Sequence, residues 1–265
     1  MNLRIPVVAT FSVLFLSGCF LSTPLHEKTV NLTVPHVPDQ ALRVESSNGR
    51  IEVTRETRVD VQITAVVRAR SPERLEATTV SAERDANGEL SVTALWPDDK
   101  RRSNEGCHYA VLAPSVSALD LKTSNGSVKA DGFSGKARLK TSNGSLTLEN
   151  HDGPVSASTS NGSVSVDGRL QAADLKTSNG KIVASGLSGE VEARTSNGSI
   201  KLALAREFEG FLDLSTSNGS VKVDSDLESA VVSRTKKRAA TLRIGGKQTQ
   251  SEARTSNGSI RVERD

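Results

Sequence analysis

Residues 119–130 read Leu-Asp-Leu-Lys-Thr-Ser-Asn-Gly-Ser-Val-Lys-Ala, and residues 137–148 read Ala-Arg-Leu-Lys-Thr-Ser-Asn-Gly-Ser-Leu-Thr-Leu. Both contain the tetrapeptide Thr-Ser-Asn-Gly, which occurs eight times in the chain when the Ser-Ser-Asn-Gly at 46–49 is included. Its asparagines are Asn48, Asn125, Asn143, Asn161, Asn179, Asn197, Asn218 and Asn257. From Asn125 to Asn197 the asparagine recurs at every eighteenth position, and a fixed short period of this kind indicates a solenoid.

The apolar residues around each tetrapeptide alternate with polar ones. Positions six and four before the Asn, and three and five after it, are apolar in every copy except at Ser251. Around Asn143 these residues are Ala137, Leu139, Leu146 and Leu148. Such alternation is typical of strands with one buried face, and it does not fit helical spacing. The alternation shifts by one residue across Ser-Asn-Gly, from even spacings before the Asn to odd spacings after it. This shift is expected if the chain turns a corner and keeps its apolar side inward.

The pattern predicts an all-β fold, a single-stranded parallel β-helix (β-solenoid) with an 18-residue coil. Each coil is a strand, an Asn-Gly corner, a second strand and a second corner. Asn-Gly also suggests hairpins, but a meander would not need the same tetrapeptide at every eighteenth residue. In a coil, like residues lie about 4.8 Å above one another, so Asn stacks on Asn and Thr on Thr, with amides and hydroxyls bonding along the stack. We expect the glycine because the corner needs a positive φ.

The period changes near the C-terminus. The interval from Asn218 to Asn257 equals one regular period plus the longer interval that separates Asn197 from Asn218, which leaves room for one more unit. We place a degenerate unit at Ser229–Gly246, with Thr235-Lys236-Lys237-Arg238 in the position of the tetrapeptide.

The period is also interrupted from Thr54 to Pro114. We interpret this stretch as longer, less regular coils that begin the same sheet and cap its end, because bare solenoid ends need covering. Within it, residues 58–68 and 89–95 alternate as strands, residues 72–79 fit a short helix, and residues 97–106 are predicted to form an exposed loop.

The segment 1–18 has the features of an export signal. Arg4 precedes the apolar run Val7–Leu16, which is too short to span a bilayer and fits a signal h-region. The run ends in Leu16-Ser17-Gly18-Cys19, which resembles the lipobox of bacterial lipoproteins, where the cysteine becomes the lipid-modified first residue. We therefore expect an acyl anchor on Cys19, which would hold the protein stably on a membrane. The alternative is an ordinary secretory signal with an incidental cysteine.

The expected organisation is a signal peptide at 1–18, a lipidated tether at 19–27, irregular N-terminal β coils and a cap at 28–114, and the regular solenoid at 115–265. By resemblance to other lipoproteins, Phe20 rather than Asp after the cysteine favours the outer membrane. Cleavage leaves Cys107 as the only cysteine that is not acylated, so no internal disulfide is expected.

Composition excludes one class of partner and offers no catalytic motif. The chain has 34 Lys plus Arg against 31 Asp plus Glu, a net charge of +3, and only 3% aromatic residues, so we expect no nucleic-acid binding. The four histidines show no metal-ligand spacing, and the chain has no nucleophile elbow or phosphate-binding glycine loop. We therefore expect no cofactor, no metal and no enzymatic activity.

The best acidic constellation is Asp131, Glu149 and Asp167, each six residues after an Asn. On stacked coils these carboxylates would lie about 5 and 10 Å apart, a spacing that suits a glycosidase pair or a calcium ion. The favoured alternative is that Asp131-Gly132 and Asp167-Gly168 are turn dipeptides.

Two charge columns run along the predicted outer face. The basic column, three before the Asn, is a candidate binding surface: Lys122, Lys140, Lys176, Arg194 and Arg254. The acidic column, five before the Asn, is Asp120, Asp174, Glu192, Asp213 and Glu252. Because same-face neighbours pair, one interpretation is a solvated, neutralised face. The other is a flat charged ridge, extended by the basic loop 234–238, that docks on anionic lipopolysaccharide, peptidoglycan or a protein.

Repeated Ser-Asn-Gly-x-(Val/Ile)-x-(Val/Leu) units follow the lipobox, and irregular strands end in a Pro114 turn before Leu119-Asp120-Leu121. This pattern resembles the bacterial putative-adhesin family of β-strand repeats, a DUF-type family, from about Lys28 to Asp265. The resemblance implies a parallel β-helix with a surface or adhesive role, but no catalytic or ligand-binding residues. We expect a non-enzymatic cell-envelope lipoprotein that binds an envelope glycan or protein. The alternatives are a polysaccharide-active β-helix enzyme and a sensing or regulatory envelope protein that acts through a partner.

Overall fold

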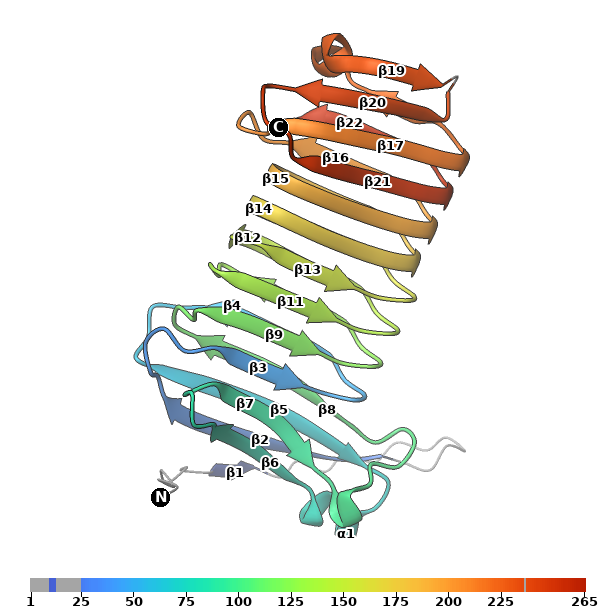
Figure 1. Cartoon of the computed structure of the whole chain (residues 1–265). Helices are drawn as coiled ribbons and strands as arrows, with labels where there is room; N and C mark the ends of the chain where they lie inside the picture. The colour runs from blue at the N-terminus through green and yellow to red at the C-terminus, as the bar shows by residue number, and fades with distance from the viewer. Residues whose placement is uncertain (1–9, 13–24, 236) are drawn as a thin grey trace. The chain divides into compact units, whose positions relative to one another are not determined.

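The computed structural model describes residues 10–12, 25–235 and 237–265. Cys19 and most of the expected signal peptide lie outside the described residues. The chain divides into two compact units, one ending at Gly126 and the other running from Ser127 to Asp265 (Figure 1). Parallel strands pair one repeat period apart, as in Ala137 with Val155, so the predicted β-solenoid is confirmed.

The C-terminal unit consists of strands joined by corners and loops. Its strands are β10 (Val128–Asp131), β11 (Lys136–Lys140), β12 (Leu146–Asp152), β13 (Val155–Ser158), β14 (Val164–Asn179), β15 (Ile182–Asn197), β16 (Ile200–Leu204), β17 (Gly210–Asn218), β18 (Val221–Val223), β19 (Val231–Thr235), β20 (Ala239–Ile244), β21 (Gln250–Asn257) and β22 (Ile260–Arg264), with a 3₁₀ turn at Ser225–Ala230.

These strands form two parallel ladders, because each coil contributes one strand to each. We call face A the ladder of β11, β13, the second halves of β14 and β15, then β21 and β17. Face B is the ladder of β10, β12, the first halves of β14 and β15, then β16, β22 and β18. The apolar residues of the repeat lie between the faces: Leu139, Leu148, Leu175 and Ile182 are 0% exposed. Burying each such side chain contributes about 1.5–3 kcal/mol.

The tetrapeptide forms the corner between the faces, and its threonines are buried there. Thr159 Oγ1 donates to Gly144 O at 3.0 Å, and Thr177 Oγ1 donates to Gly162 O at 2.9 Å. Positive φ accounts for only part of the glycine requirement, since Gly162 has φ 156° but Gly180 is not among the positive-φ residues. The shared cause is close approach: a Cβ at Gly180 would lie 1.9 Å from Gly162 O.

The prediction of a degenerate coil at Ser229–Gly246 is wrong. β19 and β20 form an antiparallel hairpin, and β20 pairs antiparallel with β17. Without an Asn-Gly corner the chain reverses, with Arg238 N donating to Thr235 O at 3.2 Å. The long interval between Asn218 and Asn257 therefore contains a hairpin, after which the chain returns to form β21 and β22.

The N-terminal unit contains strands β1 (Thr10–Ser12), β2 (His26–Pro35), β3 (Leu42–Glu45), β4 (Ile51–Arg55), β5 (Asp60–Ala69), β6 (Thr79–Arg84), β7 (Leu90–Leu95), β8 (Gly106–Ala113) and β9 (Ala118–Lys122), helix α1 (Pro72–Ala77) and a 3₁₀ turn at Pro97–Asp99. β3 pairs in parallel with β9 and β7, and β4 with β8. The remaining pairs, β1–β2, β2–β5, β5–β8 and β6–β7, are antiparallel.

The interpretation of residues 54–114 as irregular coils is therefore only partly right. The parallel pairs of β7 and β8 extend the coil of Asn48, but β5 and β6 run back as antiparallel partners. Asn48 pairs directly with Asn125 across this long excursion. Antiparallel strands suit this region because it lacks the corner tetrapeptide that turns the chain into the next coil.

The loop at 97–106, predicted to be exposed, contains a fully buried carboxylate. The Glu105 side chain is 0% exposed, and Arg74 of α1 contacts both of its oxygens, with Nε 2.7 Å from Oε1 and Nη2 2.8 Å from Oε2. The backbone N–H of Arg102 also donates to Oε2 at 2.8 Å. The hydrogen bonds from Arg74 are the main cause that lowers the pKa of Glu105 to about 2.

His151 provides a pH-dependent element of the core. It is 2% exposed at the second corner of its coil, and neither ring nitrogen has a hydrogen-bond partner among the described residues. Burial lowers its pKa from 6.5, and the backbone groups of Phe133, Pro154 and Gly135 offset this only in part. Because the folded state favours the neutral ring, the contribution of His151 to the free energy of unfolding is fully present above pH 6.5. It is lost as the pH falls below that value.

We expect urea denaturation of the protein to show a midpoint that falls between pH 7 and pH 5. In His151→Leu this part of the pH dependence should vanish, and the free energy of unfolding at pH 7 should rise by about 1–3 kcal/mol because two unsatisfied ring nitrogens are removed. Half-buried His26→Leu, in the N-terminal unit, is the control and should keep the wild-type pH profile. An unchanged pH profile in His151→Leu would contradict this assignment.

Candidate functional site

The outward side chains of face A form two rows in the C-terminal unit. In the acidic row, Asp174 is in register with Glu192, Glu192 with Glu252, and Glu252 with Asp213. In the basic row, Lys176 is in register with Arg194, Arg194 with Arg254, and Arg254 with Ser215. The rows follow from the repeat, because positions five and three before each Asn share one face of the strand.

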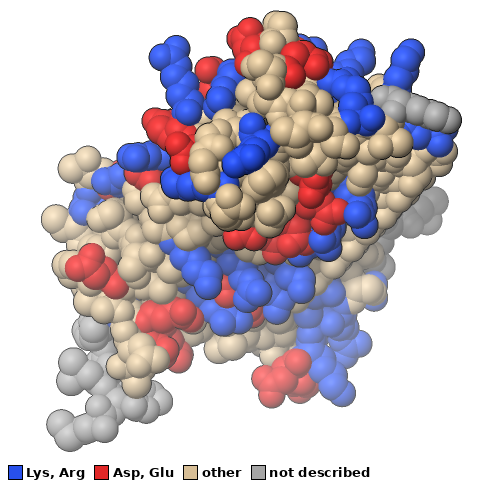
Figure 2. Space-filling view, turned by 45° about the horizontal axis from the view of Figure 1, so that its top comes forward, with Lys and Arg blue, Asp and Glu red and all other residues tan. Residues whose placement is uncertain are grey.

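The two rows are joined by ion pairs within strands and between neighbouring strands. The nitrogen–oxygen distances are 2.9 Å for Lys176–Asp174 and Lys176–Glu192, 3.2 Å for Arg194–Glu192, and 2.8 Å for Arg194–Glu252 and Arg254–Glu252. Hydrogen bonds to Asp174 and Glu192 raise the pKa of Lys176, and the hydrogen bond to Glu252 raises the pKa of Arg194. These side chains remain solvated, so the pairs contribute little to stability and act mainly to neutralise the face. Figure 2 shows the same interspersion of basic and acidic side chains.

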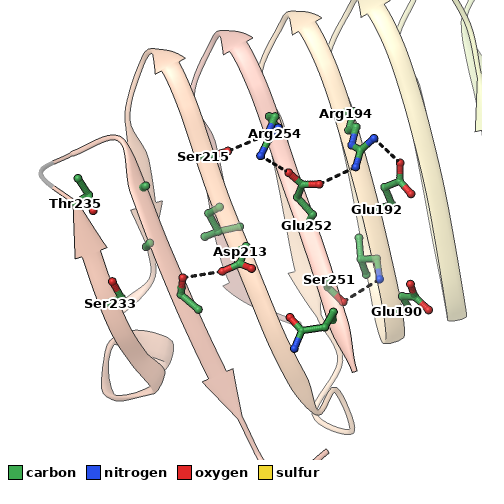
Figure 3. A pocket seen from close by; sticks show the side chains of 16 residues that line it. Glu190, Glu192, Arg194, Asp213, Ser215, Ser233, Thr235, Ser251, Glu252 and Arg254 are labelled. Carbon is green, nitrogen blue, oxygen red and sulfur yellow. Dashed lines mark hydrogen bonds and ion pairs between the residues drawn. The ribbon is translucent and has the colours of Figure 1, made fainter. Parts of the chain in front are cut away.

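A groove of about 600 Å³ opens on face A over β15, β21, β17, β20 and β19 (Figure 3). It exists because the outward side chains of β17 and β20 are short, notably Ser215, Ala239 and Thr241. Longer side chains from β15 and β21 border it on one side, and Ser233 and Thr235 of β19 lie on the other. The lining is thus polar, with hydroxyls, carboxylates and guanidinium groups.

Two carboxylates of the groove have no ion-pair partner among the described residues. Asp213 accepts a hydrogen bond from Thr241 Oγ1 at 2.6 Å, and Glu190 stands at the β15 border. On the basic side, Arg254 Nε donates to Ser215 Oγ at 3.3 Å and already pairs with Glu252. The groove therefore has an excess of hydrogen-bond acceptors and negative charge, which favours ligands that bring N–H or O–H donors or a positive charge.

The five predicted basic residues do not form one patch. Arg194 and Arg254 line the groove, whereas Lys176 lies beside it in the ion-pair rows. Lys140 is exposed on β11, and Lys122 belongs to the N-terminal unit, 3.6 Å from Glu45. Arg234 of the predicted basic loop pairs with Glu228 at 2.9 Å. The neutralised-face interpretation thus fits most of face A, and the groove is the exception.

The sequence does not predict the groove, although it places Asp213 in the acidic column. The distinct setting of Asp213 arises from the β19–β20 hairpin, where the repeat predicts a coil. The signal that points to it is the basic column itself: Ser215 stands where five of the seven other coils have Lys or Arg, which leaves Asp213 without a basic neighbour on its own strand.

The predicted asparagine column is found at one edge of the C-terminal unit. Side-chain hydrogen bonds run from Asn161 to Asn143 at 2.8 Å, Asn179 to Asn161 at 2.9 Å, Asn197 to Asn179 at 2.8 Å, Asn257 to Asn197 at 2.8 Å and Asn218 to Asn257 at 2.9 Å. In the N-terminal unit, Asn48 and Asn125 pair through their backbones. Every amide is tied to its neighbours, so this column is built for coil stacking.

The other candidates form no further site among the described residues. Asp131 and Glu149 are in register, but Glu149 pairs with Lys129 at 2.8 Å and Asp131 accepts from Asn150 Nδ2 at 2.8 Å. A β-bulge between Leu148 and His151 breaks the register toward Asp167. Across residues 25–235 and 237–265, no three His, Cys, Asp or Glu side chains form a metal-binding group.

Cys107 is buried with a free thiol, and burial raises its pKa to about 12. This thiol is therefore inert. The helices in the described part of the chain are all short, and none has the length and apolarity needed to cross a bilayer.

This arrangement of coils is shared with a known family. The family model of Toastrack DUF4097 matches residues 8–263, so the chain belongs to that family. A putative adhesin from Bacteroides fragilis is 17% identical, with coverage of 94% of this chain and 100% of that one and a TM-score of 0.48. A putative cell adhesion protein from Clostridium sporogenes is 10% identical, with coverage of 89% and 99% and a TM-score of 0.40. Comparison with curated proteins gives no match.

Proposed function

We propose that the protein is a non-enzymatic lipoprotein of the cell envelope, with an adhesin-like role in which face A binds an envelope glycan or protein. The single observation that carries this proposal is the groove with its two unpaired carboxylates, on a face that is otherwise neutralised by ion pairs. A regular hydrogen-bonded stack supports it, because a rigid surface loses little conformational entropy on binding. The lipobox at Cys19 supports export and anchoring.

The test measures retention of the purified protein on isolated peptidoglycan sacculi, whose hydroxyl and amide groups supply the hydrogen-bond donors that the groove favours. We expect retention, and a loss of about 10-fold or more in affinity for Asp213→Asn combined with Glu190→Gln. The matched control is Asp174→Asn, which removes an acid from the same row outside the groove and should retain wild-type affinity. Anionic lipopolysaccharide vesicles are the control ligand, and their retention of the protein should not fall in the groove variant. Equal affinity of the groove variant and wild type for sacculi, or no retention on sacculi, would contradict the proposal.

The enzyme alternative has its own readout in the same experiment. Asp131 and Glu149 are neighbours across two coils, near the separation of a retaining glycosidase pair. Release of soluble glycan fragments from sacculi, abolished by Asp131→Asn, would favour a polysaccharide-active enzyme. We expect no release, because Glu149 is held by Lys129.

A further inference from the structure

The last coil of the chain lies between two coils that are consecutive in sequence. β21 pairs in parallel with both β15 and β17, and β22 pairs with both β16 and β18. Figure 1 shows β21 between β15 and β17. Gln250–Asp265, which we call the C-terminal coil, therefore fills a slot whose rims are the coils of Asn197 and Asn218.

The C-terminal coil is held by segments far from it in sequence. Thr255 Oγ1 donates to Gly198 O at 2.8 Å on one rim, and Thr216 Oγ1 of the other rim donates to Gly258 O at 2.8 Å. Asp265 Oδ2 accepts from Gly186 N at 2.6 Å. Strand pairs, corner bonds and ion pairs thus supply the binding energy, and the covalent connection to β20 adds no specificity to these contacts.

The slot recognises the repeat of this chain. Each rim presents the Thr-Ser-Asn-Gly corner in register, with an amide above and an amide below the inserted Asn257. A coil that fits must carry the same tetrapeptide and the same alternation of inward-facing residues, in which Ser251 takes one apolar position and accepts a hydrogen bond from Val191 N of the rim at 3.0 Å. The coil must also place an acid opposite Arg194 of the rim, as Glu252 does. The C-terminal coil of a second copy satisfies all three conditions.

The connection from β20 to the C-terminal coil is the segment Gly245–Thr249, which is exposed up to residue 248 and makes one ion pair, Lys247–Glu209 at 3.8 Å. Gly245 has φ +68°, and a Cβ at Gly246 would meet nothing within 4 Å. The segment crosses the start of β17, where Phe211 N donates to Thr249 O at 2.8 Å. A short, glycine-containing hinge with so few contacts opens at low cost.

We propose that two copies of this chain exchange their C-terminal coils, each filling the slot of the other. The exchanged and unexchanged forms make the same hydrogen bonds and ion pairs and differ only in the hinge and in association entropy, as in other domain swaps. The exchanged coil also supplies Glu252 and Arg254 to the groove, so each groove would be completed by the other copy. The exchange is argued from strand pairing and not from ligand binding, so failure of one proposal leaves the other standing.

The first experiment mixes two full-length chains, both with Cys19→Ser, of which one carries Asn197→Cys and the other Asn257→Cys. After refolding together and mild oxidation, we expect a covalent heterodimer whose linked peptides contain positions 197 and 257. Cys107 does not interfere because it is buried. In the control pair, Asn143→Cys replaces Asn197→Cys and should give no link, since Asn143 is not adjacent to Asn257 in the column. Absence of the 197–257 link would overturn the proposal.

The second experiment shortens the hinge. Ile244 of β20 and Gln250 of β21 pair with β17 from opposite sides of that strand. They are therefore separated by two strand spacings, about 9.6 Å. Deletion of residues 245–248 leaves two Cα–Cα steps, which reach at most about 7.6 Å. The deletion variant should therefore be a dimer of twice the monomer mass by light scattering, whereas insertion of Gly-Ser-Gly-Ser after Gly246 should leave the monomer dominant. A monomeric deletion variant with a protease-sensitive C-terminal coil would refute exchange.

Discussion

Replacing Glu105 by Gln should lower the free energy of unfolding by about 3 kcal/mol, because it removes a fully buried carboxylate from its counter-charge on Arg74. The amide still accepts one hydrogen bond, so the loss lies at the lower end of the range for breaking a buried ion pair. Urea denaturation at pH 7 measures it. Exposed Glu83→Gln in the same unit is the control and should change stability by less than about 0.5 kcal/mol.

The Glu105 carboxylate also makes the stability of the protein depend on pH in the acid range. Because its folded-state pKa is about 2 against an ordinary value of 4.5, its contribution is present above pH 4.5 and is lost as the pH falls toward 2. Glu105→Gln should therefore flatten the decline of stability over that window. A destabilisation no larger than that of Glu83→Gln, or an unchanged acid profile, would show that the pair does not hold α1 to the loop.

The corner glycines should be as sensitive as the buried ion pair. In Gly162→Ala the new Cβ would lie 2.0 Å from Gly144 O, and φ of 156° is a conformation that residues with a side chain rarely adopt. Overpacking and backbone strain each cost about 1–3 kcal/mol, so we expect a loss of about 2–6 kcal/mol in the free energy of unfolding, measured by urea denaturation.

Gly246→Ala is the matched control for this prediction. A Cβ there meets nothing within 4 Å, so we expect a change of less than about 1 kcal/mol, with stabilisation the favoured sign because the unfolded chain loses freedom. Equal effects of Gly162→Ala and Gly246→Ala would mean that the coils are not stacked at backbone contact distance.

The repeat determines most of the fold because it specifies where each residue lies within a coil. The apolar positions of Leu139, Leu175 and Ile182 are read directly from the alternation, and all are fully buried. The asparagine column follows from the same argument, since the constant period places each amide above the previous one.

The repeat does not determine the order of the coils, because every coil presents the same corner. Asn257 fits equally well above Asn218 or between Asn197 and Asn218, and the latter is observed. The β19–β20 hairpin decides this outcome, because it covers β17 on the side where the next coil would have stacked. At this point of the sequence Thr235-Lys236-Lys237-Arg238 replaces the tetrapeptide, so the corner that would begin another coil is absent.

The groove could be anticipated only in part for the same reason. Its carboxylate and guanidinium residues lie in the predicted columns, as Asp213 and Arg254 do. Its shape depends on Ala239 and Thr241, which reach face A through antiparallel pairing with β17. Glu105 was missed for a different cause: a charged residue in a polar loop gives no sign that an arginine on a distant helix encloses it.

The stacking of the coils, with the C-terminal coil between its neighbours, is tested most directly by disulfide formation within the monomer. Asn197→Cys/Asn257→Cys should cross-link readily, because adjacent coils lie about 4.8 Å apart, within the Cα separation that a disulfide bridges. Asn197→Cys/Asn218→Cys should stay reduced, because an inserted coil holds these positions about 9.6 Å apart. A disulfide in the second variant and none in the first would contradict the arrangement described here.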